Sequence, residues 1–419
     1  MKYDVNSIRA QFPALSRTVN GFPAVYFDSP GGTQVPQRVI DRMVDYMINH
    51  NANTGGAFIT SIENDAVILE ARKSFRDLFG CSWNEVSFGE NSTAINFRLS
   101  HALARDLNPG DEIIITDIDH DANRSPWTIL TERGVTVKSV RVDASTCTLD
   151  IHDYKSKLSS KTKIVAFNYA SNAVGTITDA KAIIQLAHQA GAITVVDAVH
   201  YALHGVIDVR DLDVDFLFCS AYKFFGPHIG VLYSKQERLE KLRALKVSAQ
   251  KDVVPEKFET GTLNHEGLAG AAEAIEFIAD AGAKNLELVS DSESHLNDRR
   301  KKIIAGMRVF EEHEMPMAVS FKEELSNIDG LTLYAPPRGH PCTSTISFRI
   351  KDIPPMHIAK RLAEKGIFLW AGGFYAVALM KSFGVSETGG LVRIGLAPYN
   401  TQEEIDRTLA EIRSIAKSR

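Results

Sequence analysis

Several features that mark other classes of protein are missing from this 419-residue sequence. No apolar run approaches the ~18 residues that span a membrane, and the first residues carry an early acid where a signal peptide would have an apolar core. There is no block of lysine and arginine, and the formal net charge is −5, which argues against nucleic acid or an anionic membrane as the main partner. We therefore expect a cytoplasmic protein that acts on a small molecule.

Cysteine is scarce, and the four cysteines lie far apart without CxxC spacing. Neither a disulfide framework nor a structural zinc site is therefore indicated, and we expect no metal. Two nucleotide-binding patterns are also missing, since no G-x-G-x-x-G follows the first strand and no G-x-x-x-x-G-K-[ST] loop occurs. These absences argue against a nucleotide-binding dehydrogenase on a doubly wound sheet.

What the sequence does contain is a series of short, almost wholly apolar runs between helical patterns. They cover residues 112–116, 163–167, 192–197 and 216–220. Strands without polar alternation are buried on both faces, as in a parallel sheet covered by helices. A helical pattern at 178–187 separates the second and third runs and completes a βαβ unit. The sequence therefore predicts an α/β fold with a mostly parallel sheet.

The second half of the chain changes in character, and its length suggests more than one domain. We predict a small-residue helix at 267–278, a long charged helix near 286–314 and a strand at 345–350. A capping box at Thr401–Glu404 precedes a final helix. We expect a large domain over 20–285 and a smaller α+β domain formed by 1–19 and 286–419.

Chemically reactive side chains follow each apolar run: His120 after the first, Asn172 after the second, Asp197 and His200 after the third, and Ser220 and Lys223 after the fourth. Ligands of parallel α/β sheets bind at this edge. An amine among apolar neighbours loses its proton and becomes nucleophilic toward an aldehyde. A buried aspartate keeps a pyridine nitrogen protonated. Lys223 and Asp197 together are typical of a site for pyridoxal 5'-phosphate.

Other residues suit the rest of that cofactor. His120 is placed to lie on the ring face, and Asn172 to bond the ring hydroxyl. Asn91, Ser92 and Thr93 open a helical pattern whose free N–H groups suit a phosphate. Ordinary helix caps and strand-end polar residues look similar, so each signal alone is weak.

The order of these residues, with the segment 207–216 and Gly226-Pro227, resembles the class V aminotransferase group of fold-type I pyridoxal phosphate enzymes, closest to the cysteine desulfurase and selenocysteine lyase branch. The resemblance runs from residue 25 to residue 401. It implies a fold-type I transferase with a seven-stranded-type sheet. It also implies these roles: Lys223 as the aldimine lysine, Asp197 as the partner of the ring nitrogen, His120 as the stacking base, Ser92 and Ser220 as phosphate ligands, and Arg393 as the clamp for the substrate α-carboxylate.

The resemblance also implies an assembly. The segment 258–264, which contains Thr262, matches a stretch that reaches the phosphate of the neighbouring subunit. We therefore expect a homodimer with shared active sites.

Three positions depart from the family pattern. Tyr375 falls where cysteine desulfurases carry the catalytic cysteine, and a phenol with a pKa near ~10 cannot hold a persulfide. His200 replaces a glutamine that commonly contacts the ring hydroxyl, and Tyr222 replaces a histidine that helps to hold phosphate. Both substitutes can still form hydrogen bonds. The cofactor site is therefore expected to be intact while the later chemistry differs.

The resulting hypothesis is an enzyme that binds an amino acid through an external aldimine and eliminates its β-substituent, as a carbon–sulfur lyase does. Lys223 would remove the α-proton, Arg393, Tyr375 and Asn172 would contact the substrate, and Tyr375 or His120 would handle a proton. Transamination or epimerisation at the same cofactor are alternatives. A true cysteine desulfurase and an inactive sulfur-transfer scaffold are further alternatives, although Lys223, Asp197 and Arg393 together argue against an inactive protein.

Overall fold

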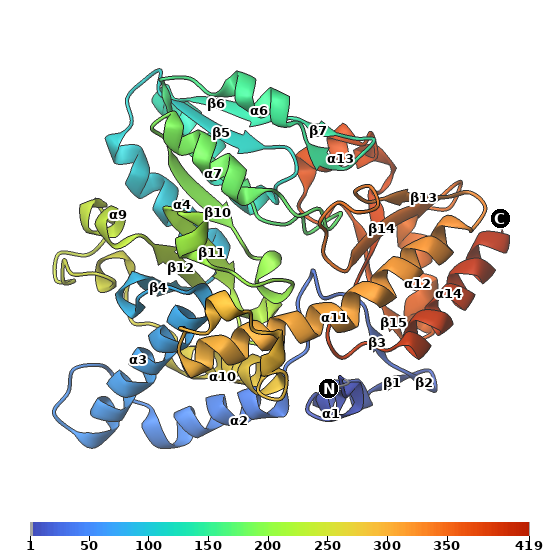
Figure 1. Cartoon of the computed structure of the whole chain (residues 1–419), viewed down its shortest axis with the longest axis horizontal. Helices are drawn as coiled ribbons and strands as arrows, with labels where there is room; N and C mark the ends of the chain where they lie inside the picture. Colours follow the sequence, from blue (N-terminus) through green and yellow to red (C-terminus); the bar gives the residue numbers. More distant parts are fainter. Residues whose placement is uncertain (1–2, 419) are drawn as a thin grey trace.

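The structure, a computed structural model, describes residues 3–418. A seven-stranded sheet forms the centre of its larger part (Figure 1). All strands run in the same direction except β12, which is antiparallel to both of its neighbours. This confirms the predicted mostly parallel sheet. Across the sheet the strands are β4 (Val86–Gly89), β12 (Gly230–Ser234), β11 (Phe216–Ser220), β10 (Ile193–Asp197), β9 (Thr162–Asn168), β5 (Glu112–Thr116) and β6 (Thr136–Val140).

The apolar runs become strands because both faces of the sheet are covered. Along β11, Leu217 packs into one apolar cluster and Phe216 and Phe218 pack into another on the opposite face. Helix α7 (Ala180–Gln189) connects β9 to β10 as predicted, and the Asp179 side chain caps it by accepting from the Ala182 N–H. The sequence pattern therefore located the four central strands to within about one residue.

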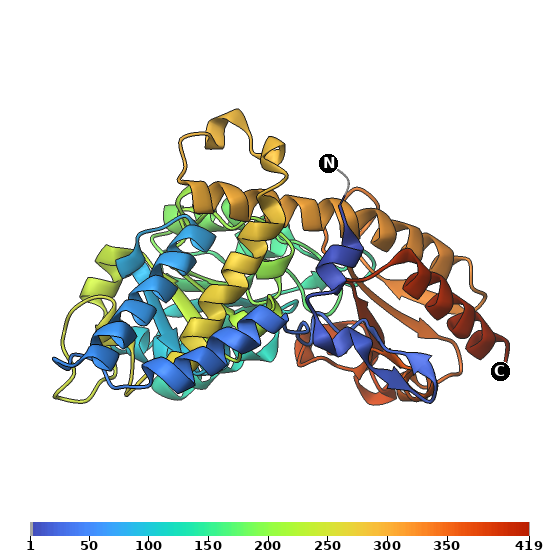
Figure 2. The same cartoon turned by 90° about the horizontal axis from the view of Figure 1, so that it is seen from below.

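Helices form a layer on each face of this sheet (Figure 2). Core side chains of α3, α10 and α11 belong to the cluster that contains Leu217, whereas those of α4 belong to the cluster that contains Phe216. The helices named so far and their neighbours are α2 (Gln37–Asp45), α3 (Ile59–Phe79), α4 (Ser92–Leu103), α5 (Ser125–Thr128), α10 (His265–Gly282) and α11 (Asp298–Ser326).

Helix α11 differs from the predicted helix near 286–314. Residues 286–293 form two short 3-10 turns, and α11 begins only after Asn297, whose side chain caps it by accepting from the Arg300 N–H. The helix then continues past Pro316 to Ser326, because Phe321 and Leu325 remain fully buried. Charge pattern alone did not reveal either end.

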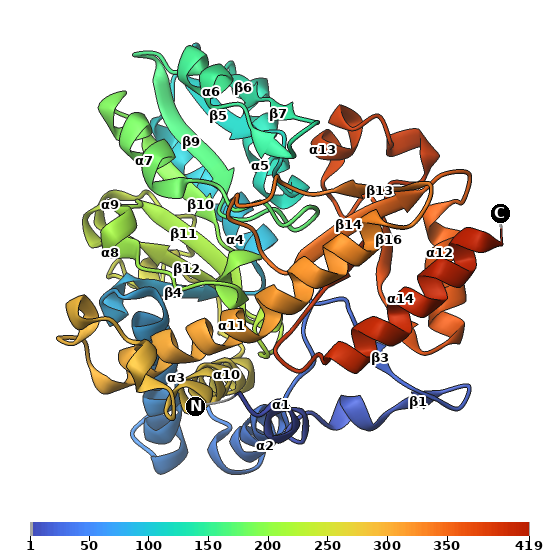
Figure 3. The ribbon, with the colours of Figure 1, turned by 45° about the vertical axis from the view of Figure 1, so that its right-hand side comes forward.

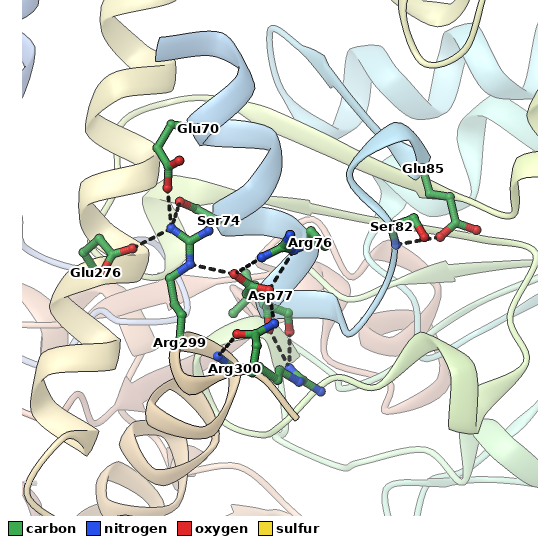
Figure 4. A network of polar contacts seen from close by, with 11 residues as sticks. Glu70, Ser74, Arg76, Asp77, Ser82, Glu85, Glu276, Arg299 and Arg300 are labelled. Atoms are coloured by element: carbon green, nitrogen blue, oxygen red, sulfur yellow. Dashed lines mark hydrogen bonds and ion pairs between the residues drawn. The ribbon is translucent and has the colours of Figure 1, made fainter. Parts of the chain in front are cut away.

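A polar network holds the start of α11 against the end of α3 (Figure 4). The Asp77 carboxylate accepts hydrogen bonds from Arg76 (2.8 Å), Arg299 (2.6 Å) and Asn297 (2.9 Å). Burial by itself raises the pKa of Asp77, but the hydrogen bonds from these side chains outweigh it and hold the pKa below its ordinary value. Arg299 also bonds Glu276 on α10, so three helices meet at one guanidinium.

A second, smaller core surrounds an antiparallel four-stranded sheet beside the large one (Figure 3). The C-terminal half of α11 packs on it through Phe321 and Leu325, and α14 begins with the predicted capping box of Thr401 and Glu404. Its elements are β13 (Leu331–Tyr334), β14 (Thr345–Ile350), β16 (Trp370–Gly372), β17 (Leu391–Gly395), α12 (Pro355–Glu364) and α14 (Gln402–Lys417).

The N-terminal segment contacts both cores. Strand β3 (Val25–Tyr26) pairs with β15 (Ile367–Phe368) of the smaller part, and Phe12 packs in the large core. The division of the chain at residues 20 and 286 stays a prediction. Within residues 3–418 no helix is both long and apolar enough to cross a bilayer. The remaining elements are α1 (Val5–Arg9), β1 (Thr18–Val19), β2 (Phe22–Pro23), β7 (Val142–Asp143), β8 (Thr148–Leu149), α6 (Ile151–Lys157), α8 (Val209–Leu212), α9 (Gln236–Lys241) and α13 (Val377–Ser382).

Candidate active site

A cavity of about 1070 Å³ lies where the carboxyl ends of the central strands meet the smaller core. Its floor comes from the ends of β9 and β10 and from the turn after β11, one side from the start of α4, and the other from β16 and β17. Ten of the predicted site residues line it: Ser92, Thr93, His120, Asn172, Asp197, His200, Tyr222, Lys223, Tyr375 and Arg393.

Three predicted residues do not line the cavity. Asn91 caps α4 by accepting from the Ala94 N–H. Ser220 is buried at the edge of the site, where its Oγ accepts from the Ser92 N–H at 3.2 Å. Thr262 is exposed in the loop before α10.

Lys223 lies three residues beyond the end of β11, in a single 3-10 turn. Its Nζ donates to the carbonyl oxygens of Pro30 at 2.5 Å and Gly31 at 3.0 Å. Burial and the nearby positive charge of Arg393 lower its pKa to about 7, although Asp197 and Asp28 act in the opposite direction. A large fraction of this amine is therefore unprotonated and nucleophilic near neutral pH.

Asp197 ends β10 beside the lysine and is only 5% exposed. Its Oδ1 accepts from the Val199 N–H at 2.9 Å. Burial raises the pKa of this carboxyl to about 6, against the effects of that hydrogen bond and of Lys223. A cationic or protonated partner in the cavity would stabilise the carboxylate form.

His120 borders the cavity close to the Tyr375 ring. The ring centroids of His120 and Tyr375 are 5.4 Å apart, with 28° between the planes. The Ala122 N–H donates to Nδ1, so the proton of the neutral ring lies on Nε2. Burial and the positive Lys223 lower the pKa of His120 to about 4, so the imidazole is neutral at pH 7.

Arg393 comes from β17 of the smaller sheet and is 4% exposed. Its Nη1 donates to the Asn172 carbonyl at 2.9 Å, and its Cζ lies 4.3 Å from the centre of the Phe374 ring. Burial lowers its pKa to about 9, with Asp28 opposing the shift. The buried Nε has no hydrogen-bond partner in the described part of the chain. An anion in the cavity would supply one.

The loop of Phe374 and Tyr375 has an unusual backbone. Both residues have positive φ angles, 54° and 55°, which cost a non-glycine residue about 1–3 kcal/mol each. Two hydrogen bonds hold them: Asn172 Nδ2 donates to the Phe374 carbonyl at 2.9 Å, and the Asp121 N–H donates to the Tyr375 carbonyl at 2.7 Å. Tyr375 is 74% exposed at the mouth of the cavity.

Two predicted cofactor contacts therefore already have protein partners. Asn172 uses its amide nitrogen on this loop, while its buried Oδ1 is unpaired among residues 3–418. His200 directs Nε2 to the hydroxyls of Thr343 (3.1 Å) and Thr345 (2.9 Å) of the smaller part. Both side chains thus connect the large sheet to the smaller core.

Sequence reasoning missed Asp28, which acts electrostatically on Lys223 and Arg393. Burial raises the pKa of Asp28 to about 6, against the effects of Arg393 and Lys223. The sequence feature that could have indicated Asp28 is the segment from Asp28 to Gly32, which has two glycines and directly follows a short apolar stretch. No strand pattern marked it as a site residue.

The arrangement fits a flat, phosphorylated pyridine aldehyde. A neutral amine faces a buried carboxylate, a neutral imidazole lies nearby, and the α4 N-terminus offers N–H groups to a phosphate. Within the part of the chain that the structure describes, the buried Oδ1 atoms of Asn168 and Asn172 lack hydrogen-bond partners. Fold and site together therefore define the class of pyridoxal phosphate-dependent enzymes with a mostly parallel seven-stranded sheet.

Comparison with known proteins confirms this class. The family model described as Aminotransferase class-V matches residues 25–305 and 302–408. The chain therefore belongs to the aminotransferase class-V family, and it is an enzyme that depends on pyridoxal 5'-phosphate.

Its relatives are cysteine desulfurases. The chain is 35% identical to the cysteine desulfurase of Synechococcus elongatus over 99% of its own length, and it spans 64% of that protein. It is 33% identical to a probable cysteine desulfurase of Halalkalibacterium halodurans, with 96% of each chain covered. The apo cysteine desulfurase of Thermococcus onnurineus superposes with a TM-score of 0.86 at 25% identity, covering 100% of this chain and 99% of that one. The chain is thus cysteine desulfurase-like in sequence and fold.

Proposed function

We propose that this protein is a carbon–sulfur lyase, which converts an amino acid of the type R–S–CH₂–CH(NH₂)–COOH and water into pyruvate, ammonia and the thiol R–SH. The observation that carries the proposal is the composition of the cavity. Among residues 3–418, no cysteine lines it. A persulfide requires a thiolate at the substrate sulfur, and an elimination does not.

The four cysteines lie elsewhere. Cys219 is fully buried within β11, and burial raises the pKa of its thiol well above the ordinary value. Cys342 is half-buried, with its Sγ 3.5 Å from Lys322 Nζ, outside the cavity lining. Cys81 and Cys147 also have thiol pKa values raised by burial. Tyr375 occupies the mouth where we expect the family's cysteine, which supports elimination.

Each residue then has a defined task. When bound, pyridoxal phosphate supplies an electron sink that acidifies the substrate Cα–H. Lys223, after the substrate amine has replaced it, takes the α-proton, because its lowered pKa lets it accept and release a proton near pH 7. Arg393 binds the α-carboxylate with a planar fork. The Asp197 carboxylate would keep the ring nitrogen of the cofactor protonated.

The leaving thiolate needs a proton, which the Lys223 ammonium formed by removal of the α-proton returns, and the neutral His120 is suited to stabilise the thiolate with a hydrogen bond. Its Nε2 carries a hydrogen while Nδ1 accepts from the Ala122 N–H. The adjacent Tyr375 hydroxyl is a second donor at the mouth. We assign His120 and Tyr375 to this step, with Ser92, Thr93 and Ser220 at the phosphate.

We further propose a homodimer in the cytoplasm. Thr262 is exposed, as it must be to reach a neighbouring subunit, and the four cysteines are free. An exposed apolar face on α2, α3 and the segment between them suits a subunit interface. Its side chains are Ile40, Val44, Met47, Ile48, Phe58, Ile59 and Ile62.

Product analysis tests the reaction. The loaded protein is incubated with L-cysteine and with S-substituted cysteines, and pyruvate, alanine and protein-bound persulfide are measured. Pyruvate in equal amount to the released thiol supports the proposal, and Lys223→Ala should abolish it. Alanine with a persulfide would refute it in favour of desulfuration. Pyridoxamine phosphate or racemised substrate without pyruvate would instead establish transamination or epimerisation.

A further inference from the structure

The lining of the active-site cavity contains several bulky apolar side chains, which a cofactor and a small polar amino acid do not need. At about 1070 Å³ the cavity reaches the upper end of the roughly 300–1,000 Å³ that hold drug-sized ligands. Six bulky apolar side chains are among the residues that line it: Phe97, Trp370, Phe374, Tyr375, Val377 and Met380. We call these six residues the apolar wall.

The apolar wall lies where a substrate side chain would project. The Phe374 ring packs on the Arg393 guanidinium, and the Tyr375 ring stacks with His120. An amino acid with its carboxylate on Arg393 and its α-carbon at Lys223 would therefore direct its side chain toward Phe374 and Tyr375, and the other four residues of the apolar wall line the same cavity.

Parts of the apolar wall are strongly exposed, which costs free energy unless something covers them. Tyr375 is 74% exposed, Val377 60% and Trp370 54%. Hydrogen bonds to their carbonyl oxygens, one from the Asn172 side chain and one from the Asp121 N–H, hold Phe374 and Tyr375 in strained conformations, so the protein maintains this surface against a local cost. Because the apolar wall is continuous with the cavity that holds Lys223 and Arg393, a ligand in that cavity is the occupant that reaches it.

The charged groups of the cavity also favour a substrate with an uncharged side chain. In the described part of the chain, the only lysine and arginine that line the cavity are Lys223 and Arg393, and the reaction and the α-carboxylate use both. His120 and His200 also line it, but burial, the largest cause, lowers the pKa of each ring, so both are neutral at pH 7. Asp121 adds a carboxylate near the mouth. A second carboxylate on the substrate would find no cation and would meet a negative charge.

We propose that the apolar wall is a subsite for a bulky apolar group on the substrate sulfur, such as an aryl or branched-alkyl group, and that the site rejects acidic amino acids; this inference rests on the proposed amino-acid chemistry. The substrate class is then an S-conjugate of cysteine whose second substituent is uncharged. Elimination from it gives pyruvate, ammonia and an apolar thiol.

Binding, separated from turnover, tests the subsite. Amino acids with a methyl group in place of the α-hydrogen cannot lose an α-proton, so their affinity for the pyridoxal phosphate-loaded protein is measured at equilibrium by calorimetry. We expect α-methylphenylalanine to bind at least tenfold tighter than α-aminoisobutyrate, a difference of about 1.4 kcal/mol. We expect α-methylaspartate to bind at least tenfold more weakly than α-aminoisobutyrate.

Two pairs of variants locate the effect. Phe97→Ala should reduce the affinity for α-methylphenylalanine about tenfold and leave α-aminoisobutyrate unchanged. Leu286→Ala, which truncates a similarly exposed apolar side chain outside the cavity, should change neither. Val377→Lys should raise the affinity for α-methylaspartate at least tenfold, because it adds the missing cation, whereas Val377→Gln, of similar length, should not.

The outcomes separate the two proposals. If none of the three ligands binds, the amino-acid function fails and the subsite with it. If all three bind with similar affinity, or if Phe97→Ala acts like Leu286→Ala, the subsite inference is overturned while the amino-acid site stands. If α-methylphenylalanine is excluded while α-aminoisobutyrate binds, the apolar wall is covered by something other than substrate, and the inference is wrong.

Discussion

The lowered pKa of Lys223 predicts how fast the cofactor-free protein captures pyridoxal phosphate. Only the neutral amine attacks an aldehyde. With a pKa of about 7, roughly half of Lys223 is neutral at pH 7, whereas an ordinary lysine with a pKa of 10.5 is neutral in roughly one molecule in 3,000. The reactive fraction therefore rises by a factor on the order of 10³.

The measurement is the second-order rate of cofactor capture, followed by absorbance in a stopped-flow instrument between about pH 5.5 and 9.5, a range that brackets the expected midpoint. A free lysine derivative, measured in parallel, corrects for the ionisation of the cofactor itself. At each pH the protein's rate constant is divided by the rate constant of the neutral form of the free lysine derivative. This ratio should rise to a plateau with a midpoint near pH 7. Lys223→Ala gives the background from other lysines. A rate that keeps rising tenfold per pH unit through about pH 9 would show an ordinary lysine and refute the reasoning.

Two substitutions test the physical cause, because they act in opposite directions. Arg393→Gln removes a positive charge that lowers the pKa of Lys223, so the midpoint should move up. Asp28→Asn removes a negative charge that raises it, so the midpoint should move down. The same shift also affects stability: between pH 7 and 10.5 the unfolded chain binds more protons at this lysine than the folded chain, so its contribution to stability increases with pH. Midpoints that move in the same direction would contradict an electrostatic origin.

Three further substitutions address the fold and the loop. Asp77→Asn should lower the free energy of unfolding by about 1–3 kcal/mol at pH 7 in chemical denaturation, because it weakens the hydrogen bonds that this buried carboxylate accepts from three side chains. The loss should shrink as pH falls through the lowered pKa of Asp77, since the wild-type carboxyl is then neutral too. A pH-independent difference would rule out that linkage. Gly306→Ala should lower the free energy of unfolding by about 1–3 kcal/mol and leave the cofactor spectrum unchanged, because a Cβ there would lie 2.2 Å from the Ile278 carbonyl oxygen. An unaffected melting temperature would contradict this close packing of α10 and α11. Tyr375→Val should be less stable than Tyr375→Asn by about 1 kcal/mol, because asparagine tolerates a positive φ and a β-branched residue does not; equal stability would show that the loop relaxes.

The sequence predicted the floor of the site much better than its walls. β10 and β11 are buried on both faces, so an apolar run and the polar residue at its end sufficed to place Asp197 and Lys223. The opposite wall depends on contacts between segments far apart in the chain, such as Asn172 with Phe374, which no periodicity reveals. Asp28 follows a strand of only two residues, too short to produce a pattern.

The same limit explains α11. Its predicted start failed because local caps, at Ser290 and Asn297, decide where the helix begins. Its end failed because burial of Leu325 against the smaller core extends it beyond the charged stretch. A local cap sets the start and a tertiary contact sets the end, and an argument from charge pattern and helix propensity includes neither.

Helix α11 also determines how the protein can be divided. Its first half supplies Ile303, Met307 and Phe310 to the large core, and its second half supplies Phe321 and Leu325 to the small one. A fragment ending at residue 285 would leave the large core without these three side chains, and a fragment beginning at 286 would carry them exposed to water. Separate expression of the two parts should therefore yield insoluble material, and circular permutation should succeed only at loops that leave α11 uncut.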